Sequence, residues 1–242
     1  MTYAVSSGCV TFVNADIGGG DASSLRIAGS RIVAMGAAAC PGDCVVDLHG
    51  DRLLPGLINA HDHLHLNTVS PVESAGGWRH AREWVAEVNL RRRTDPVFES
   101  QLRMPRDERL LIGGVKNLLS GVTTVAHHDT PYPFLSGEHF PTYALTAYGW
   151  SHSLYIDGEE KVRSACLSTP PDYPWFIHAA EGVDEEAAGE FDRLDALGCV
   201  KANTLIVHGV ALDRDRRVRL ERAAAGLIWC PSSNLRLFGS TA

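Results

Sequence analysis

The sequence predicts an α/β protein in which a small strand-rich N-terminal domain precedes a (β/α) barrel of the TIM type. From about residue 55 onward, short apolar strands alternate with amphipathic helices, an order typical of parallel βαβ units. Eight of the eleven histidines lie at or just past the end of a strand-like run: His61, His63, His65, His127, His128, His152, His178 and His208. This distribution favours a barrel, because the C-terminal rim of a barrel holds its active site. An open doubly wound sheet is the alternative, since its ligands also bind at strand ends.

Residues 1–55 are expected to form the separate β-rich domain. Four strand-like runs are separated by glycine-rich turns, and they cover residues 10–13, 24–27, 31–35 and 45–48. The glycine run at 18–20 has neither G-x-G-x-x-G spacing nor a strand-to-helix context. We therefore expect no nucleotide site there.

Residues 56–242 are expected to form the barrel domain. Its predicted strands cover residues 57–60, 122–126, 175–177, 204–207 and 227–230, with a further strand between 147 and 156. Its predicted helices cover residues 106–120, 183–197 and about 212–225. Gly121 and Gly198 follow two of these helices and are candidates for the glycine that commonly ends a helix.

The composition excludes several classes of partner. The formal net charge of −7 leaves no basic footprint, so we expect no nucleic-acid partner. No apolar run approaches the roughly 18 residues of a membrane span, so we expect no membrane partner. The six cysteines include no C-x-x-C pair, and Cys40 and Cys44 are expected neither to bind metal nor to form a disulfide. This pattern favours a reduced, cytoplasmic protein, with a homo-oligomer left open.

The segment His61-Asp62-His63 predicts a metal site at the end of a strand. Side chains alternate with a period of two along a strand, so the two imidazoles lie on the same side. Two nitrogen ligands arranged in this way suit a divalent ion such as zinc, which binds histidine nitrogens at about 2.0–2.1 Å. Solvated or core histidines are the alternative for an isolated His-x-His.

A second cluster, His178 with Glu181, lies at the end of a later strand. A histidine at this place can supply a third metal ligand. A carboxylate three residues further on can reach the activated water or the substrate and move protons between them. The alternative is that Glu181 caps the following helix.

His208 ends the next strand in the same manner. It is too distant along the chain to share a local motif, but the rim of a barrel would bring it to the same site. An imidazole there can polarise a substrate carbonyl or an amidine nitrogen. A lone structural histidine is the alternative.

Four stretches together resemble the cytosine deaminase, guanine deaminase and triazine hydrolase branch of the amidohydrolase superfamily. They are LPGLINAHDH at 54–63, GVTTVAH at 121–127, HAAE at 178–181 with VHG at 207–209, and CPSSNL at 230–235. Their order and spacing match over most of residues 25–240. The resemblance implies a metal-dependent amidohydrolase or deaminase that acts on carbon–nitrogen bonds other than peptide bonds. Its substrate would be a small molecule, namely an amide, a cyclic amidine or an aminated heterocycle.

The resemblance also assigns roles to residues of this sequence. It implies that one zinc or iron ion is held by His61, His63 and His178. It implies that Glu181 shuttles protons and that His208 contacts the substrate and the activated water. The residues implied at the rim beside the site are Ser233 and Asn234.

Three more histidines, His65, His128 and His152, are candidates for the substrate pocket. Of the adjacent His127 and His128, at most one can point inward, because neighbours on a strand face opposite sides. We favour His128. No lysine stands at a strand end before His178, so a carbamate-bridged two-metal site is not expected.

The sequence departs from the family pattern in two places. The family carries a further aspartate, which is a metal ligand and base, in a turn beyond the position of Ala242, together with strands that complete an N-terminal β-sandwich. We therefore expect a barrel that is incomplete at its C-terminus, and a non-catalytic remnant that binds metal without turnover is the alternative function. Only 49 residues separate His128 from His178, so one βα unit is expected to be shortened or absent.

Overall fold

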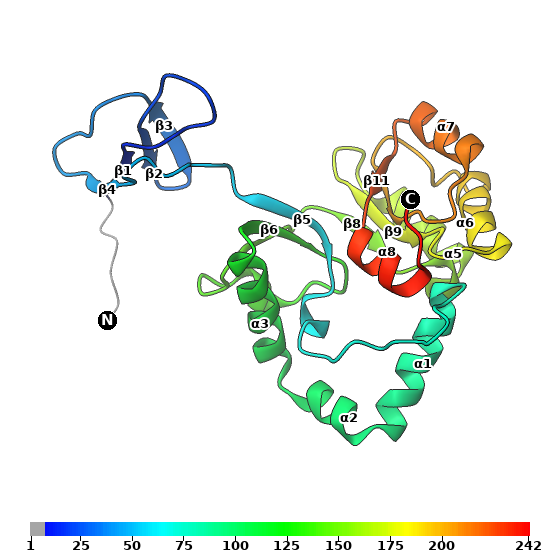
Figure 1. Ribbon diagram of the computed structural model, residues 1–242. Helices are drawn as coiled ribbons and strands as arrows, with labels where there is room; N and C mark the ends of the chain where they lie inside the picture. Colours follow the sequence, from blue (N-terminus) through cyan, green and yellow to red (C-terminus); the bar gives the residue numbers. More distant parts are fainter. Residues whose placement is uncertain (1–7) are drawn as a thin grey trace. The chain divides into compact units, whose positions relative to one another are not determined.

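The computed structural model describes residues 8–242 (Figure 1). Residues 1–7, which belong to the expected N-terminal domain, lie outside this range. The chain divides into two compact units, one ending at Gly56 and the other formed by Leu57–Ala242. Every residue of the expected site belongs to the second unit.

The first unit is a four-stranded mixed sheet with the order β3-β2-β1-β4. Its strands are β1 (Val10–Val13), β2 (Leu25–Ala28), β3 (Arg31–Met35) and β4 (Cys44–Asp47). Asp43 accepts hydrogen bonds from Thr11 Oγ1 at 2.7 Å and from Arg26 Nε at 2.8 Å, and these bonds hold the pKa of its carboxyl well below the usual range. The described residues of this unit form one sheet and no helix. The second sheet that a sandwich requires is not among residues 8–56, and it stays a prediction.

The second unit contains two parallel sheets. One has the order β5-β6-β7 and consists of β5 (Leu57–Asp62), β6 (Val122–His127) and β7 (Tyr143–Ala144). The other has the order β11-β10-β9-β8 and consists of β8 (Gly149–Ser151), β9 (Trp175–Ala179), β10 (Thr204–His208) and β11 (Gly226–Ile228). The predicted α/β architecture with parallel strands is confirmed. No strand pairing joins the two sheets within residues 57–242, so a closed barrel stays a prediction.

The register of these sheets aligns the strand ends that carry histidines. Val207 of β10 lies opposite His178 of β9, and His208 lies opposite Ala179. In the other sheet, Asp62 of β5 lies opposite His127 of β6. Parallel pairing with this register brings the C-terminal ends of the strands, and their polar side chains, to the same edge of each sheet.

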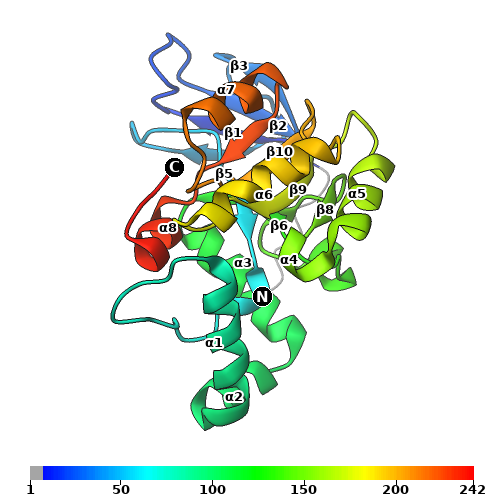
Figure 2. The ribbon, with the colours of Figure 1, turned by 90° about the vertical axis from the view of Figure 1, so that its right-hand side faces the viewer.

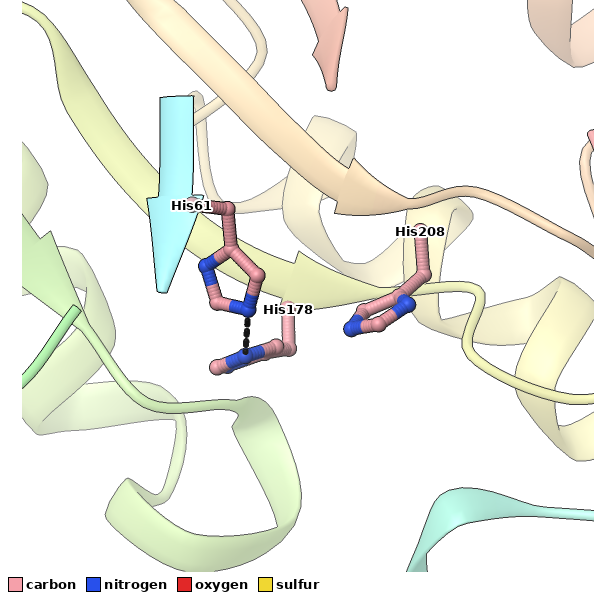
Figure 3. Close-up of side chains that lie close together, drawn as sticks. All are labelled: His61, His178 and His208. Atoms are coloured by element: carbon pink, nitrogen blue, oxygen red, sulfur yellow. Dashed lines mark hydrogen bonds between the residues drawn. The ribbon is translucent and has the colours of Figure 1, made fainter. Parts of the chain in front are cut away.

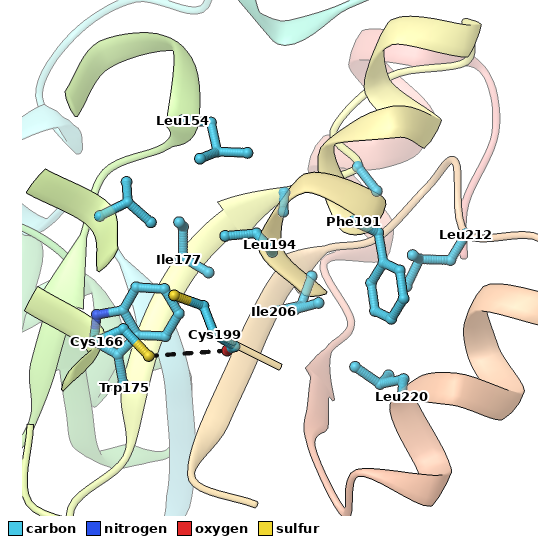
Figure 4. Packing of buried hydrophobic residues seen from close by; sticks show 13 residues of the cluster. Leu154, Cys166, Trp175, Ile177, Phe191, Leu194, Cys199, Ile206, Leu212 and Leu220 are labelled. Atoms are coloured by element: carbon cyan, nitrogen blue, oxygen red, sulfur yellow. Dashed lines mark hydrogen bonds between the residues drawn. The ribbon is translucent and has the colours of Figure 1, made fainter. Parts of the chain in front are cut away.

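The larger core surrounds β9 and β10, whose strands read as nearly continuous apolar runs (Figure 4). Trp175 and Ile177 of β9 and Ile206 of β10 are fully buried against Phe191 and Leu194 of α6 (Glu185–Ala196). Burial of each such side chain contributes about 1.5–3 kcal/mol relative to its exposed state. Figure 2 shows α6 lying over this sheet, near α5 (Glu159–Ser168) and α7 (Arg214–Arg222). This packing gives the strand ends of β9 and β10 a rigid support.

The smaller core lies beside β6, where α3 (Arg106–Leu119) packs on the short helix η1 (Leu64–Leu66) that follows β5. Gly113 makes this approach feasible, because a Cβ there would lie 2.4 Å from the backbone oxygen of Leu64. Leu64 and Leu110 are fully buried at this contact. The chain that leaves the end of β5 is therefore held in place by α3.

Within residues 8–242, five α-helices were not among the predicted elements, namely α1 (Ala81–Thr94), α2 (Pro96–Arg103), α4 (Leu154–Asp157), α5 and α8 (Pro231–Phe238). α1 carries Trp84, Val85 and Val88 at helical spacing, but these side chains are only partly buried. The start of α2 did carry a local signal, because Asp95 caps it and Pro96 occupies its first position.

The connection between β7 and β8 agrees with the predicted shortening of one βα unit. Residues 145–148 alone join these strands, and they form no helix. β8 itself lies inside the predicted range 147–156. It is followed by the short helix α4 (Leu154–Asp157) and then by α5.

None of the helices among residues 8–242 is both long and apolar enough to cross a membrane. The six cysteines are free thiols. Cys166 and Cys199 are buried in the larger core, whereas Cys40 and Cys44 are exposed in the first unit.

Candidate metal centre

Histidines from three strand ends converge at one place in the second unit. His178 Nε2 lies 3.3 Å from His61 Nε2 and 3.3 Å from His63 Nε2. Figure 3 shows His61, His178 and His208 pointing toward one another from β5, β9 and β10. One ligand-type nitrogen from each of these three lies within 4.8 Å of the others. The mutually close group thus contains His208, while His63 lies beside it through its 3.3 Å approach to His178, and the ligand set of His61, His63 and His178 stays a prediction.

The spacing and protonation of these nitrogens fit a divalent ion. Two nitrogens bound tetrahedrally at about 2.0–2.1 Å from one zinc ion lie roughly 3.3 Å apart. His178 Nδ1 lies 2.7 Å from the carbonyl oxygen of His152, so Nδ1 carries the proton and donates it. The Nε2 of His178 is then unprotonated, and its lone pair faces the ring nitrogens of His61 and His63. A cation beside it would satisfy this lone pair.

Burial keeps these rings in the form that binds metal. Desolvation lowers the pKa of His61, His63 and His178 well below the usual value, because the buried site disfavours a charged ring. The neighbouring histidines lower each pKa further. The rings are therefore neutral at neutral pH, and neutral imidazole is the ligand that zinc requires.

An amide network anchors the end of β5. Asp62 lies between the two histidines in sequence, so its side chain faces the other side of the strand. It accepts hydrogen bonds from Asn67 at 2.7 Å, from Asn117 of α3 at 2.8 Å and from Asn59 at 3.1 Å. Burial nevertheless raises the pKa of Asp62 above its usual value. By fixing Asp62, the network also fixes the direction in which His61 and His63 point.

Glu181 and His208 form a second polar pair beside these histidines. Glu181 Oε1 lies 3.3 Å from His208 Nε2. On the other side of the ring, His208 Nδ1 donates to Asn234 Oδ1 at 2.8 Å. Burial raises the pKa of Glu181, while His208 opposes that rise. The pair can hold one proton between the carboxylate and the ring.

The backbone at this pair adopts left-handed conformations. His208 has a φ of 76° and Ala180, which precedes Glu181, has a φ of 53°, values that cost energy for residues with a Cβ. Gly209 follows with a φ of 60°, and a Cβ there would lie 2.4 Å from Leu227 Cδ1. The turns after β9 and β10 are therefore set by tertiary packing, and they aim Glu181 and His208 at each other.

A buried acid and a buried histidine at this site were not predicted from the sequence. Glu190 of α6 and His80, which precedes α1, are each 3% exposed, and their Oε1 and Nε2 atoms lie 3.6 Å apart. Glu190 Oε2 also accepts a hydrogen bond from the Ala180 N–H at 2.9 Å. Burial raises the pKa of Glu190 to about 7. A signal existed in the sequence, because Glu190 falls on the apolar face of its helix three residues after Ala187 and four before Leu194.

A cavity of about 920 Å³ opens at this site. The predicted residues that line it are His61, His63, His152, His178, Glu181, His208 and Ser233. Three other predicted residues, His65, His128 and Asn234, are not among the lining residues. Asn234 is fully buried and bonds His208, while His65 Nε2 faces Asp129 at 3.4 Å. Apolar and aromatic walls are added by Ile58, Trp84, Val85, Tyr155, Ile156 and Trp229.

His128 is the inward member of the pair at the end of β6. It is 2% exposed, with Nδ1 3.1 Å from His61 Nδ1 and Nε2 2.8 Å from the Ser151 carbonyl oxygen. His127 points the other way, and its ring centroid lies 5.8 Å from that of His65. His128 thus points toward His61, and both of its ring nitrogens are bonded within the protein.

A second group of ligand-type side chains consists of His65, His127 and Asp129. His127 Nδ1 accepts the Leu64 N–H at 3.3 Å, which leaves the proton of a neutral ring on Nε2. Arg106 Nη2 lies 3.8 Å from Asp129 and already provides a positive charge. These contacts make this group a poor cation site compared with the one around His178.

No family model matches the chain. It is 25% identical over 275 residues to a 5-methylthioadenosine/S-adenosylhomocysteine deaminase of Halobacterium salinarum, an alignment that covers 98% of this chain and 63% of the relative. It is 33% identical over 81 residues to an 8-oxoguanine deaminase of Pseudomonas aeruginosa, which covers 31% of this chain and 18% of the relative. The chain thus spans less than two thirds of the length of these curated relatives.

Solved structures with a similar fold include hydrolases that carry zinc. A triazine hydrolase variant superimposes with a TM-score of 0.70 at 16% identity, covering 95% of this chain and 67% of that one. An atrazine chlorohydrolase from Arthrobacter aurescens complexed with zinc gives 0.70 at 14% identity, with 94% and 67% covered. An adenosine deaminase from Xanthomonas campestris with bound zinc gives 0.63 at 18% identity, with 90% and 59% covered. At these identities the likeness establishes a shared fold.

Proposed function

We propose that this chain, which is related to the deaminases and triazine hydrolases of the amidohydrolase superfamily, carries the metal centre of a hydrolase that uses water to cleave carbon–nitrogen bonds. The observation that carries the proposal is the 3.3 Å spacing from His178 Nε2 to both His61 Nε2 and His63 Nε2. The proposed targets are carbon–nitrogen bonds other than peptide bonds, in an amide, a cyclic amidine or an aminated heterocycle.

His61, His63 and His178 would hold one divalent ion, for which zinc is the first choice and iron the second. Two of the similar structures contain zinc, which supports this order. Such an ion supplies Lewis acidity and lowers the pKa of water in the site toward about 7. The three rings contribute neutral, preoriented nitrogens, and the amide network around Asp62 holds two of them in place.

Glu181 and His208 would move protons during the reaction. Glu181 lines the cavity, and its raised pKa allows the carboxyl group to carry a proton at a pH where an exposed glutamate has lost it. It can take a proton from water and deliver it to the departing nitrogen. His208, held through Nδ1 by Asn234, keeps Nε2 beside Glu181 Oε1, where it can stabilise developing negative charge.

The cavity walls favour a planar substrate. Trp84, Tyr155 and Trp229 line the cavity and offer aromatic surfaces on which a heterocycle can stack. Of the three further histidines proposed for substrate binding, His152 lines the cavity and keeps that role here, as does Ser233 at its rim. His65 and His128 do not line it, so we propose no substrate contact for them.

We also propose that residues 57–242 form most of a (β/α) barrel and that the strands before Leu57 belong to a composite β-sandwich. The TM-scores of 0.63 to 0.70 over most of the chain support this proposal. In it, the sheets β5-β6-β7 and β8-β9-β10-β11 are two arcs of one barrel. The site lies where the C-terminal ends of both arcs face each other.

The test combines metal content with turnover. The purified chain is loaded with Zn²⁺, its bound metal is measured, and release of ammonia is followed with a panel of aminated purines, pyrimidines and triazines. We expect one ion per chain and ammonia release that the Glu181→Gln variant abolishes without losing metal. The exposed Glu185→Gln is the matched control and should behave like the parent. Metal without turnover would support the alternative of a non-catalytic remnant, and absence of tight metal binding would refute both.

A further inference from the structure

His128 occupies a place that the proposed reaction does not use. It is the first residue after β6, and its ring stacks on that of His178 with centroids 4.1 Å apart. Both of its nitrogens are engaged, one by His61 and one by the backbone of Ser151. A ring enclosed in this way is unavailable to a substrate, but it is in contact with one metal ligand through a hydrogen bond and with another through its face.

We propose that His128 is a positioning residue that fixes the tautomer of His61 so that the Nε2 lone pair of His61 faces the metal site. This inference rests on the proposed function, because it assigns a role toward the same ion. The three contacts that carry it are His128 Nε2 to Ser151 O, His128 Nδ1 to His61 Nδ1, and His61 Nε2 to His178 Nε2.

The tautomers follow from these contacts in order. The Ser151 carbonyl oxygen can only accept, so His128 Nε2 carries a proton and donates it over 2.8 Å. In a neutral ring, His128 Nδ1 is then unprotonated and can accept a hydrogen bond. His61 Nδ1 lies 3.1 Å from it and must supply the proton for that hydrogen bond. His61 is therefore protonated on Nδ1, and its Nε2 is left bare.

His178 reaches the same state through the next carbonyl along the chain. Its Nδ1 donates to His152 O over 2.7 Å, while His128 donates to the oxygen of the preceding residue, Ser151. Ser151 ends β8 and lies opposite Ile177, the residue before His178 on the paired strand. Two consecutive carbonyl groups at the end of one strand thus set the protonation of two ligands, directly for His178 and through His128 for His61.

The result is a site whose lone pairs are aligned before an ion arrives. Histidine ligands generally donate their second ring nitrogen to a carboxylate, a carbonyl or water, and loss of such a partner weakens metal binding by about 10–100-fold. His61 instead uses a neutral imidazole as that partner. The stacked geometry explains the choice, because the same ring also buttresses the face of His178.

The test compares His128→Leu, which removes the acceptor, with His128→Asn, whose amide oxygen can take the place of Nδ1. His127→Leu is the matched control, because His127 is equally buried on the adjacent position but points toward His65. Zn²⁺ affinity is measured on the full chain by competition with a chromophoric chelator. ¹⁵N chemical shifts of the imidazole nitrogens in the metal-free chain report the tautomer of His61.

We expect His128→Leu to weaken Zn²⁺ binding by about 10–100-fold and to move part of the His61 population to the Nε2-protonated tautomer. His128→Asn should restore affinity to within a few-fold, and His127→Leu should leave it unchanged. The inference is overturned if His128→Leu keeps both the affinity and the His61 tautomer, or if His127→Leu loses as much affinity. If the parent chain binds no Zn²⁺, the proposed function fails, while the tautomer measurement still decides the role of His128.

Discussion

The imidazole rings of His128 and His178 lie face to face, with centroids 4.1 Å apart and planes 2° from parallel. The two residues come from different sheets, because His128 follows β6 of the three-stranded sheet and His178 belongs to β9 of the four-stranded sheet. His61 reaches the same place from β5. Neither sheet alone can therefore assemble the candidate metal centre.

Replacement of His178 by alanine is expected to abolish metal binding. Its Nε2 lies 3.3 Å from both His61 Nε2 and His63 Nε2, so its loss removes the ring that the other two share. Elemental analysis should show about one zinc per parent chain and almost none in the variant. The control is His139→Ala, whose ring is 91% exposed. Zn²⁺ at 100 times its Kd should stabilise the parent and the control by about 2.7 kcal/mol and so raise their Tm. The Tm of His178→Ala should not change.

The buried carboxyl group of Glu190 is expected to make stability depend on pH. Burial raises the pKa of Glu190 from 4.5 to about 7 in the folded chain, so between these values the folded state binds more protons than the unfolded state. The free energy of unfolding therefore falls as pH rises from about 4.5 to 7, by up to about 3 kcal/mol for this group. Glu181 reinforces the shift, while Arg193 and the Ala180 N–H oppose it.

Glu190→Gln should remove this part of the pH dependence. Denaturant unfolding at pH 5 and pH 7 measures it, with Glu185→Gln as the exposed control on the same helix. We expect the variant to gain stability relative to the parent mainly at pH 7. An unchanged difference between the two pH values would show that Glu190 titrates normally.

Asn234→Ala is expected to release His208. Asn234 is fully buried and accepts the Nδ1 proton of His208, so its loss leaves a buried donor without a partner, at a cost of about 1–3 kcal/mol. The neighbouring Ser233→Ala is the control, because its hydroxyl makes a local bond to the Cys230 carbonyl oxygen. Thermal unfolding should separate the two variants, and equal Tm values would contradict a structural bond between Asn234 and His208.

Gly209→Ala is expected to be more damaging than Gly198→Ala. Both glycines have left-handed backbones, with φ values of 60° and 70°, so both variants carry the roughly 1–2 kcal/mol penalty of a Cβ in that region. Only at Gly209 would the Cβ also meet side chains, at 2.4 Å from Leu227 Cδ1 and 3.1 Å from Leu212 Cδ1. Chemical denaturation should show the larger loss for Gly209→Ala, and a smaller loss would mean that the two leucines repack freely.

The amino-acid sequence by itself determined most of the strands of the second unit and the positions of the candidate ligands. Local rules were sufficient for this, because apolar periodicity marks the strands and because the residues after a parallel strand lie at its functional end. His61, His63 and His178 could be picked out as residues at strand ends, and the family resemblance implied that they hold one ion. Glu181 was selected by its distance from His178. The helix α1 was not predicted, although Trp84, Val85 and Val88 lie on one face of it.

Only the tertiary structure decided what each side chain touches. Strand register and the meeting of two sheets place His128 against His61 and His178, turn His65 toward Asp129, and bring Glu190 under Ala180. These contacts join residues that are tens of positions apart in the chain, so no local pattern encodes their distances. The physical reason is that hydrogen-bond partners, and with them the protonation of each ring, are properties of the packed site rather than of any one strand.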